Sequence, residues 1–441
     1  MADENSRRFP RQWWVLALFA VAAAVAVWQQ FVRIPFSTPM YGLFHNQIDA
    51  EVYRKGGEIV AHGGEGLYDG PLLNDILPFT YTPFAGVLFV PLSWMSTEVL
   101  RWVWTIAVML ALLACVLIAL RLVGFVRDWR VWFAAICLTL VATVLEPVRT
   151  TIWFGQINVF LMLLLLWDLG RPAGARFKGF SIGIAAGIKL TPLFFLAYLV
   201  VTRQWREART AIATLAGTVV IGFLVIPQQS WQYWSGTFLD ANRVGEPNQV
   251  GNQSINGLIA YLTHAEEPST AVWLAVAVPA ALAGLGIAAW AYRRDEVLLA
   301  VTVVGLTACA VSPFSWGHHW VWIVPLLVLL IGRALLTADP GRRVLALVAA
   351  AALVAATFIW VTYFPHLQPT GVDDVHDTYA IGIFLRPMDN PVLKALAGGV
   401  YVWIFVATLI GSAWYLRHTE DRPALADEAV PAGPGRSGRA A

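Results

Sequence analysis

The sequence predicts an all-α polytopic membrane protein with about twelve transmembrane segments, and three observations support this prediction. Of its 441 residues, 58% are hydrophobic and only 13% are charged, whereas a soluble domain carries about 25% charged residues. Many apolar runs reach about 20 residues, the length that a helix needs to cross a bilayer. The 21 tryptophans fit this class as well, because Trp collects where hydrocarbon meets water. This composition excludes a water-soluble enzyme.

Apolar runs of spanning length occur along the whole chain. They are residues 13–32, 99–120, 131–148, 152–169, 210–226, 271–292, 297–312, 319–336, 344–362 and 393–416. The run 179–202 is interrupted by Lys189 and Pro192, which predicts two half-helices that form a hairpin, because broken helices at membrane depth line cavities. The run 82–96 is too short to cross comfortably and predicts a re-entrant segment or a short packed helix.

The distribution of charge predicts the orientation. Roughly two thirds of the 30 basic residues fall on one side of the predicted spans, which places both termini in the cytoplasm of a multi-pass protein of the cell (plasma) membrane. Three long loops, 33–81, 227–270 and 363–392, then face the extracytoplasmic side. Residues 1–416 form one integral-membrane domain, and residues 417–441 predict a disordered cytoplasmic tail. The net charge of +2 gives no reason to expect a nucleic-acid partner.

The first extracytoplasmic loop contains an amphipathic helical pattern in residues 45–69, with Asp49 and Tyr53 one turn apart. We expect Gly56, Gly57, Gly63 and Gly64 to break this helix, which would hold Asp49 just outside the bilayer. A solvated or capping role is the ordinary alternative for a loop aspartate.

Several other polar groups lie at predicted membrane boundaries, where such groups tend to be functional. The segment EPVRTTIWFGQINV offers candidate sugar ligands, although its acid and arginine could simply pair with each other; these groups are Glu146, Arg149, Gln156 and Asn158. Lys189 needs an anion, which a phosphate at the outer leaflet would provide, unless its side chain snorkels to the surface. Tyr81 in LPFTYTPFAG is expected at headgroup level, as a ligand or as part of an aromatic belt.

Two later segments also combine aromatic and polar residues. The loop 230–257 is rich in Trp, Asn, Gln and Gly, a composition suited to carbohydrate, and contains Asn252 and Gln253. In SPFSWGHHWVWIVPL, Trp316 precedes His318 and His319; neighbouring residues on a helix point about 100° apart, so the two histidines make a poor metal site. One of them could instead contact a phosphate or a sugar hydroxyl. We identify no metal site, no cofactor motif and no nucleotide-binding motif.

Taken together, DAEVY in the first loop, LPFTYTPFA, EPVRTTIWFGQINVFLM, GIKLTP, NQSINGLI and SPFSWGHHWVWIVPL resemble the actinobacterial (mycobacterial-type) polyprenol-phosphate-mannose-dependent α-(1→2)-mannosyltransferases. These belong to the GT-C superfamily of membrane glycosyltransferases. The resemblance extends from about residue 45 to about residue 335. Thr82 departs from the pattern, because the family usually has proline there.

The resemblance implies an inverting transfer of mannose from a polyprenyl phosphomannose donor to a glycolipid mannoside acceptor, either a phosphatidylinositol mannoside or lipomannan/lipoarabinomannan, with membrane lipid around the protein. Asp49 matches the family's first-loop aspartate and would be the general base. The donor phosphate and lipid-linked sugar would contact Lys189, His318, His319, Arg149 and Tyr81. The acceptor or sugar would contact Gln156, Asn158, Glu146, Asn252, Gln253 and Trp316.

Two alternatives remain open at this stage. The same fold could use another lipid-linked sugar, as in a decaprenyl-phosphoarabinose arabinosyltransferase. A lipid or sugar permease is a different class, and the near absence of carboxylates at mid-membrane depth counts against a coupled transporter.

Overall fold

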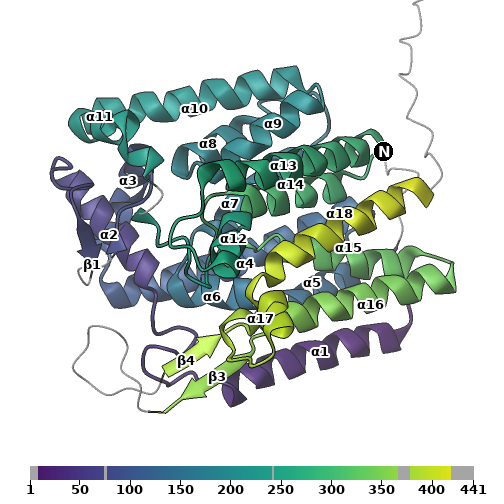
Figure 1. Ribbon diagram of the computed structural model, residues 1–441. Coiled ribbons are helices and arrows are strands. Elements are labelled where there is room, and N and C mark those ends of the chain that lie inside the picture. Colours follow the sequence, from purple (N-terminus) through teal and green to yellow (C-terminus); the bar gives the residue numbers. More distant parts are fainter. Residues whose placement is uncertain (1–7, 74–76, 241–242, 366–377, 419–441) are drawn as a thin grey trace, which may run out of the picture.

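The computed structural model describes residues 8–73, 77–240, 243–365 and 378–418, which form a helical bundle with two short antiparallel hairpins (Figure 1). Pro71 pairs with Pro78 in one hairpin, and Val361 pairs with Ile381 in the other. The strands are β1 Pro71–Leu73, β2 Leu77–Pro78, β3 Val361–Phe364 and β4 Thr378–Ile381. The described residues are therefore mostly helical, as predicted for a membrane protein, but they also contain these two short hairpins, which the all-α prediction did not include.

Among the described residues, six helices are long and apolar enough to cross a membrane, or seven spans if the bent pair at residues 146–169 is counted as one. They are α1 Trp13–Val32, α4 Thr97–Val123, α10 Trp205–Val225, α13 Thr270–Arg293, α16 Pro340–Thr357 and α18 Val400–His418. Their outward faces carry large exposed apolar side chains, among them Trp13 (77% exposed) and Leu224 (78%), as expected for contact with lipid tails. The total of about twelve spans stays a prediction.

Shorter helices fill the space between these spans. They are α2 Ile48–Ala61, α3 Pro83–Phe89, α5 Trp129–Ala142, α6 Glu146–Phe154, α7 Asn158–Leu169, α8 Phe180–Ile188, α9 Phe194–Val201, α11 Pro227–Ser235, α12 Ile255–Thr263, α14 Val297–Val311, α15 Ile323–Leu336 and α17 Pro391–Gly398. The 3-10 turns are η1 Val90–Trp94, η2 Thr191–Leu193, η3 Thr237–Leu239, η5 Gly317–His319 and η6 Ile383–Leu385.

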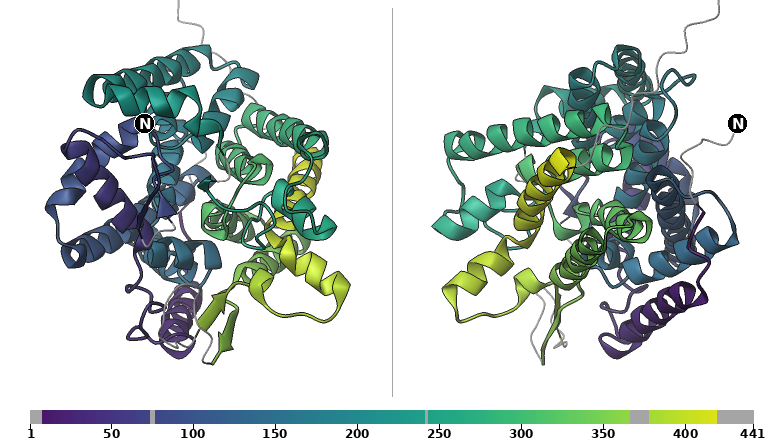
Figure 2. Two further views of the ribbon diagram at one scale, coloured as in Figure 1. Left: turned by 60° about the vertical axis from the view of Figure 1, so that its left-hand side comes forward. Right: turned by 90° about the vertical axis from the view of Figure 1, so that its right-hand side faces the viewer.

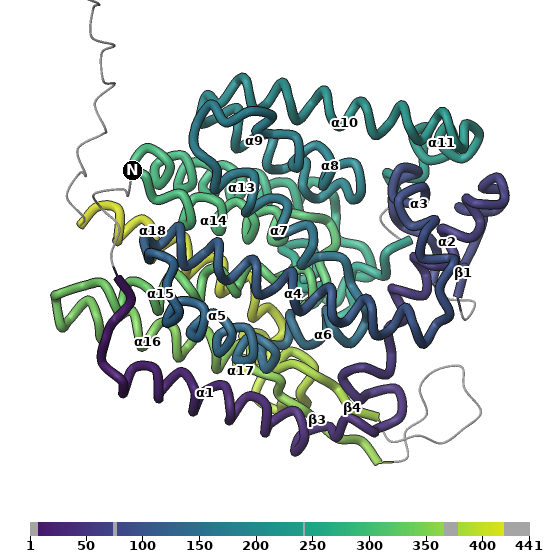
Figure 3. The backbone as a smooth tube through the Cα atoms, turned by 180° about the vertical axis from the view of Figure 1, so that it is seen from behind, coloured from purple at the N-terminus to yellow at the C-terminus, as the bar shows by residue number. Residues whose placement is uncertain are grey.

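The bundle has two distinct ends (Figure 1). We call the end where α2, α3, α11 and the β3–β4 hairpin gather the loop end, and the opposite end, where α1 begins and α18 terminates, the basic end. The helix α4 runs from one end to the other and packs against α5, α7 and α15 (Figure 3). The β3–β4 hairpin lies beside the end of α1, and Ile381 and Ala26 belong to the same buried apolar cluster (Figure 2). Both ends of the described chain thus lie at one end of the bundle, which agrees with termini on the same side.

The prediction of separate spans at 131–148 and 152–169 was wrong in detail. The chain forms three helices there, because α5 stops at Ala142, and α6 and α7 meet at a bend of 117°. Gly155 ends α6 in the left-handed conformation, with φ 71°. A side chain at that position would approach Ala50 Cβ to 2.7 Å, so glycine both permits the bend and lets α2 pack against it.

The prediction of a broken hairpin at 179–202 is confirmed by its two short helices. Gly179 lies against Glu207, Gly183 against Ala211 and Gly187 against Thr218, so α8 rises alongside α10 from that helix's first turn. The helix α9 then returns to the start of α10. Lys189 stands at the top of α8 in extended conformation, with φ −142° and ψ 138°, where the chain reverses.

The prediction that Gly56 and Gly57 break the first-loop helix was wrong. The helix α2 continues through both residues to Ala61. A side chain at Gly56 would meet the ring of Phe79, and one at Gly57 would meet the backbone of Phe89. These glycines therefore allow close packing of α2 against the segment that contains α3, and tertiary contact outweighs their low helix propensity.

Candidate active site

Asp49 lies in the first turn of α2, and the residue that precedes this helix fixes its position. Gln47 adopts a left-handed conformation with φ 51°, and its backbone N–H donates to Trp153 O at 2.7 Å. Its side-chain amide donates to Ile152 O at 2.6 Å and to Thr105 Oγ1 at 3.3 Å. The start of α2 is thereby tied to the end of α6 and to α4, so Asp49 faces the bend between α6 and α7.

The environment of Asp49 favours a carboxyl group that exchanges its proton near neutral pH. Burial raises the pKa of Asp49 from its ordinary 3.8 to about 6, while a hydrogen bond from Gln156 and the charge of Lys189 limit the rise. The side chain nevertheless keeps some exposed surface. A carboxylate with this pKa is ionised at pH 7 and is a stronger base than a solvated aspartate.

Gln156 is the centre of a hydrogen-bond network beside Asp49. The hydroxyl groups of Tyr53 and Tyr81 share a hydrogen bond of 2.7 Å, and Gln156 Oε1 accepts from this pair, lying 3.3 Å from the Tyr53 hydroxyl and 3.4 Å from the Tyr81 hydroxyl. Asn158 Nδ2 also donates to this oxygen, at 3.4 Å. Because Gln156 Oε1 accepts all these bonds, its NH₂ group is the donor toward Asp49.

Lys189 lies on the other side of this network. Its Nζ donates to Asn158 Oδ1 at 3.3 Å, contacts His319 Nε2 at 3.2 Å and lies 5.5 Å from the centre of the Tyr81 ring. Within the described residues no carboxylate forms an ion pair with Lys189, although Asp49 is close enough to interact with its charge. An ammonium has three donors, so one of them is available to an incoming anion.

Thr82 joins the segment before α3 to the hairpin that carries Lys189. Its hydroxyl donates to Gly187 O and accepts from Ala85 N at 3.2 Å, so it caps α3 and fixes the end of α8 at once. The departure from the family's proline at this position therefore provides a contact that proline could not make.

The two adjacent histidines point in different directions. Their rings are inclined at 85°, and only His319 contacts Lys189. His318 lies with its ring near those of Phe154 and Trp316, and its backbone oxygen accepts from Asn158 Nδ2 at 3.0 Å. His319 is thus the histidine that faces the cluster.

A small cavity of about 40 Å³ opens beside Lys189. Its polar rim comprises Asn158, Lys189, Cys309 and His319. The remaining wall is largely apolar, with Leu161, Met162, Leu165, Phe195 and Trp322. This volume suits a few water molecules, so a sugar would have to occupy the space on the Asp49 side of the network.

Glu146 and Arg149 form a separate buried group on α6. The hydroxyl of Tyr401 donates to Glu146 Oε2, and Thr150 Oγ1 donates to Glu146 Oε1 at 2.9 Å. Arg149 donates to Tyr41 O at 2.6 Å and lies over the Trp153 ring at 5.3 Å. These contacts fasten α6 to α18 and to the chain that follows α1. In the described part of the chain, no hydrogen bond or ion pair joins Glu146 or Arg149 to Lys189.

Asn252 and Gln253 use their side-chain amides to hold neighbouring loops together by hydrogen bonds to the backbone. Asn252 Nδ2 donates to Pro247 O and Pro313 O, and its Oδ1 accepts from the backbone of Ser254 and Ser315. Gln253 Nε2 donates to Val250 O and Gly398 O, both at 2.7 Å. The amides are satisfied inside the protein, and we do not include them in the sugar site.

Trp316 packs against Gly251 and against the rings of Phe314 and His318. Trp316 also forms an isolated antiparallel β-bridge with Asn252, so both residues hold the same two loops together. Among the predicted site residues, the structure brings together Asp49, Tyr81, Gln156, Asn158, Lys189 and His319; we call this set the polar cluster.

Two members of this site were absent from the predicted set. Tyr53 contacts both Tyr81 and Gln156, and its position one turn after Asp49 was the available signal. Cys309 donates to His319 O at 3.3 Å and lines the small cavity, and nothing in its apolar surroundings distinguished it in the sequence. In the part of the chain that the structure describes, no three His, Cys, Asp or Glu residues are arranged to hold a metal ion.

Comparison with known proteins gives one family match. The profile of Glycosyltransferase family 87 matches residues 79–313. This range includes four of the six residues of the polar cluster, all except Asp49 and His319. No solved structure matches the chain.

Curated relatives extend the similarity to nearly the whole chain. A polyprenol-phosphate-mannose-dependent alpha-(1-2)-phosphatidylinositol mannoside mannosyltransferase of Mycobacterium tuberculosis is 33% identical over 93% of this chain and 92% of that protein. A polyprenol-phosphate-mannose-dependent alpha-(1-2)-phosphatidylinositol pentamannoside mannosyltransferase of the same species is 37% identical over 68% of this chain and 69% of its own. An alpha-(1->3)-arabinofuranosyltransferase of Corynebacterium glutamicum is 27% identical over 59% of this chain and 63% of its own length.

Proposed function

Because the chain belongs to glycosyltransferase family 87, we propose that it transfers mannose from polyprenyl phosphomannose to a phosphatidylinositol mannoside, forming an α-(1→2) linkage. The names of the relatives support this donor and this acceptor class. The observation that carries the proposal is the proximity of a partly buried carboxylate, Asp49, to an ammonium, Lys189, that forms no ion pair with any described residue.

Asp49 is the general base. An acceptor hydroxyl is a weak nucleophile, so Asp49 takes its proton as the oxygen attacks the anomeric carbon of the donor. The new bond joins the acceptor oxygen to that carbon while the bond from carbon to phosphate oxygen breaks. Attack opposite to the leaving group converts a β-linked donor into an α-linked product.

Lys189 stabilises the leaving group. Charge accumulates on the polyprenyl phosphate as its bond to mannose breaks, and a fixed cation beside it lowers the free energy of that transition state. Asn158 and His319 hold Lys189 Nζ by hydrogen bonds and so orient its remaining N–H. Phosphate is already a good leaving group, and no general acid is needed.

Gln156 links the two charged groups. Its amide NH₂ bonds to the Asp49 carboxylate, and its oxygen is fixed by Tyr53, Tyr81 and Asn158. The base therefore keeps one orientation relative to the phosphate site. The positive-inside distribution of arginines supports an extracytoplasmic position for the loop end, where a lipid-linked donor is accessible from the outer leaflet.

Mannosyl transfer by purified protein tests the proposal. Wild-type protein should move labelled mannose from polyprenyl phosphomannose to phosphatidylinositol mannoside, and Asp49→Asn should lower the rate about 10²- to 10⁴-fold. Asp69→Asn is the matched control, because Asp69 belongs to the same loop but is exposed and contacts only Gln232 in the described structure. Normal transfer by Asp49→Asn would exclude Asp49 as the base.

One relative supports a second candidate. The arabinofuranosyltransferase of C. glutamicum matches 59% of the chain, so the same site could take a lipid-linked pentose. Separate assays with polyprenyl phosphomannose and decaprenyl phosphoarabinose distinguish the two donors. Transfer of arabinose alone would retain the mechanism and overturn the proposed sugar. A lipomannan or lipoarabinomannan acceptor stays a prediction that the mannose assay can test.

A further inference from the structure

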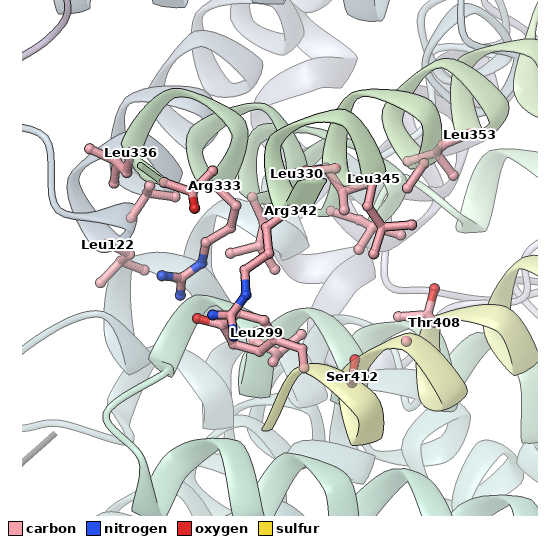
Figure 4. A pocket seen from close by; sticks show the side chains of 18 of the residues that line it. Leu122, Leu299, Leu330, Arg333, Leu336, Arg342, Leu345, Leu353, Thr408 and Ser412 are labelled. Carbon is pink, nitrogen blue, oxygen red and sulfur yellow. The ribbon is translucent and has the colours of Figure 1, made fainter. Parts of the chain in front are cut away.

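A second cavity, far larger than the first, opens at the basic end. Its volume is about 1610 Å³, and it lies between α15 and α16 on one side and α14 and α18 on the other (Figure 4). The helix α16 packs on α15, whereas α18 packs on α13 and α14, so the two outer helices face each other across an open groove. We call this space the lipid groove.

The walls of the lipid groove are apolar over most of their length. On α16, the lining residues repeat at helical spacing and form one face: Leu345, Ala346, Ala349, Ala352, Leu353 and Ala356. On α18, Ala407 and Gly411 leave space opposite this face. The small side chains on α16 and α18 leave the space between these helices unfilled, and leucine side chains form the rest of the apolar wall.

The length of the groove matches a lipid chain. Arg342 and Ala356 both line it and lie fourteen positions apart on α16, which corresponds to about 21 Å of helix at 1.5 Å per residue. One leaflet contributes about 15 Å of hydrocarbon to a bilayer. The lined part of α16 is therefore longer than the hydrocarbon depth of one leaflet, so the whole of an acyl chain can lie against this helix.

The polar lining of the groove is concentrated at one end. Arg121, Arg127, Arg333 and Arg342 lie there with a single carboxylate, Asp295. Figure 4 shows the side chains of Arg333 and Arg342 extending from their helices into the space above Leu299. This end therefore has an excess of positive charge at the depth where a lipid headgroup would lie.

Two of these arginines are free to bind an anion. Arg333 pairs with Glu296, and Arg342 pairs with Asp339 and donates to His418 O at 2.9 Å, which bridges α16 and α18. Arg121 and Arg127 are exposed and form no ion pair with any described residue. They lie at the end of α4 and in the turn that follows it.

We propose that the lipid groove binds one anionic phospholipid of the inner leaflet, with its phosphate at Arg121 and Arg127 and its acyl chains between α16 and α18. Charge complementarity selects the headgroup, and the apolar walls hold the chains. The bound lipid fills the gap between two helices that share few direct contacts.

The lipid groove is distinct from the site of mannosyl transfer. The start of α2 is anchored to Thr105 of α4, and Arg121 lies sixteen positions further along that helix, about 24 Å at 1.5 Å per residue. A phosphate bound at Arg121 is therefore too far from Asp49 to belong to a reacting donor. The proposal does not depend on the nature of the transferred sugar.

Native mass spectrometry of the full-length protein tests the proposal. Protein is equilibrated in detergent micelles with equal amounts of phosphatidylglycerol and phosphatidylcholine, and the lipid retained per protein is counted. We expect one phosphatidylglycerol to be retained in preference to phosphatidylcholine. The variant Arg121→Gln/Arg127→Gln should weaken this retention about fivefold per arginine, whereas Arg176→Gln/Arg209→Gln, which changes two exposed arginines outside the groove, should not.

A pair of variants on α16 tests the apolar part. Ala352 lines the groove and Ala351 does not, although both are exposed on the same turn. Ala352→Trp should reduce phosphatidylglycerol retention, and Ala351→Trp should leave it unchanged. Equal retention of both lipids, or equal behaviour within either pair of variants, would overturn the proposal, as would retention of a polyprenyl phosphate in this groove. Asp49→Asn should retain the lipid normally, which separates this outcome from failure of the proposed enzyme.

Discussion

The two ends of the bundle carry cavities of opposite character. At the loop end, three residues of the polar cluster, Asn158, Lys189 and His319, line a cavity of about 40 Å³. The side chains of the cluster come from separate segments that hydrogen-bond to one another. At the basic end, the lipid groove encloses about 1610 Å³, and its apolar walls face each other across open space. A network of hydrogen bonds fixes the orientation of each group, as a reaction at one carbon requires. The lipid groove selects a ligand by its shape and, through the arginines at one end, by its charge, and this selectivity is enough to bind a lipid.

Lys189→Met should produce the largest effect among the variants that sharpen this contrast. Loss of a preorganised cation at the leaving phosphate should reduce kcat about 10²- to 10³-fold, and Lys189→Arg should restore part of it. Steady-state kinetics with polyprenyl phosphomannose measures this effect. Lys55→Met is the control, because Lys55 lies on α2 and donates only to Leu72 O in the described structure. If Lys189→Met changed KM alone, Lys189 would bind the donor without stabilising the leaving group.

Gln253→Leu should destabilise the fold and leave the chemistry intact. The change leaves the buried Gly398 oxygen and the partly buried Val250 oxygen without their donor, at a cost of about 1–3 kcal/mol. We expect a lower Tm in detergent and an unchanged kcat/KM for the folded fraction. Gln232→Leu, at an exposed position, is the control for stability. A lower kcat/KM with an unchanged Tm would instead indicate that Gln253 contacts the sugar.

The acid limb of the pH–rate profile should report Asp49. With its pKa raised to about 6, Asp49 loses its function as a base as the pH falls below that value, and transfer at pH 6 should be about half of the plateau rate. Gln156→Leu removes the hydrogen bond that lowers this pKa, so the limb should move to higher pH. A limb that stays in place would show that Gln156 does not contact the carboxylate.

The same pKa predicts the effect of Asp49→Asn on stability. The folded-state pKa lies above the ordinary value of 3.8, so the ionised carboxylate destabilises the fold, and this effect is complete above about pH 6. Asp49→Asn should therefore unfold at the same temperature as wild type, or a higher one, at pH 7. A lower Tm would indicate that Asp49 also has a structural role.

The lipid-groove variants should have the smallest effect on transfer. Arg121→Gln/Arg127→Gln lies far from Asp49, and distant sites act independently, so mannosyl transfer should remain within about twofold of wild type. The measurement is the same kinetic assay in detergent with both lipids present. A large loss of transfer would mean that the two ends are coupled.

The sequence predicted features that depend on local composition. Long apolar runs cross membranes wherever they occur, so α1, α4 and α10 lie within or close to the expected positions. A lysine beside a proline inside such a run already indicates a broken helix, and the structure has its turn at Lys189. Asp49 was selected by resemblance, and its surroundings in the structure are consistent with that choice.

The structure departs from the expected local contacts where the partner of a side chain comes from a distant segment. Glu146 could pair with Arg149 three residues away, yet its closest contact is Tyr401, 255 positions along the chain. Gln253 has the composition of a sugar ligand but bonds to Gly398. Gly56 signals a break, but the ring of Phe79 stands where a side chain would be. Spacing along the chain does not encode such contacts.

The sequence by itself determined that this chain lies in a membrane and which of its segments are too polar or too broken to cross it, because hydropathy and charge are properties of each segment alone. Only the tertiary structure decided which amides orient the base and which are satisfied in the interior. It also showed where the helices leave a groove. These features depend on which distant segments pack together, and every buried polar group must find a partner among them.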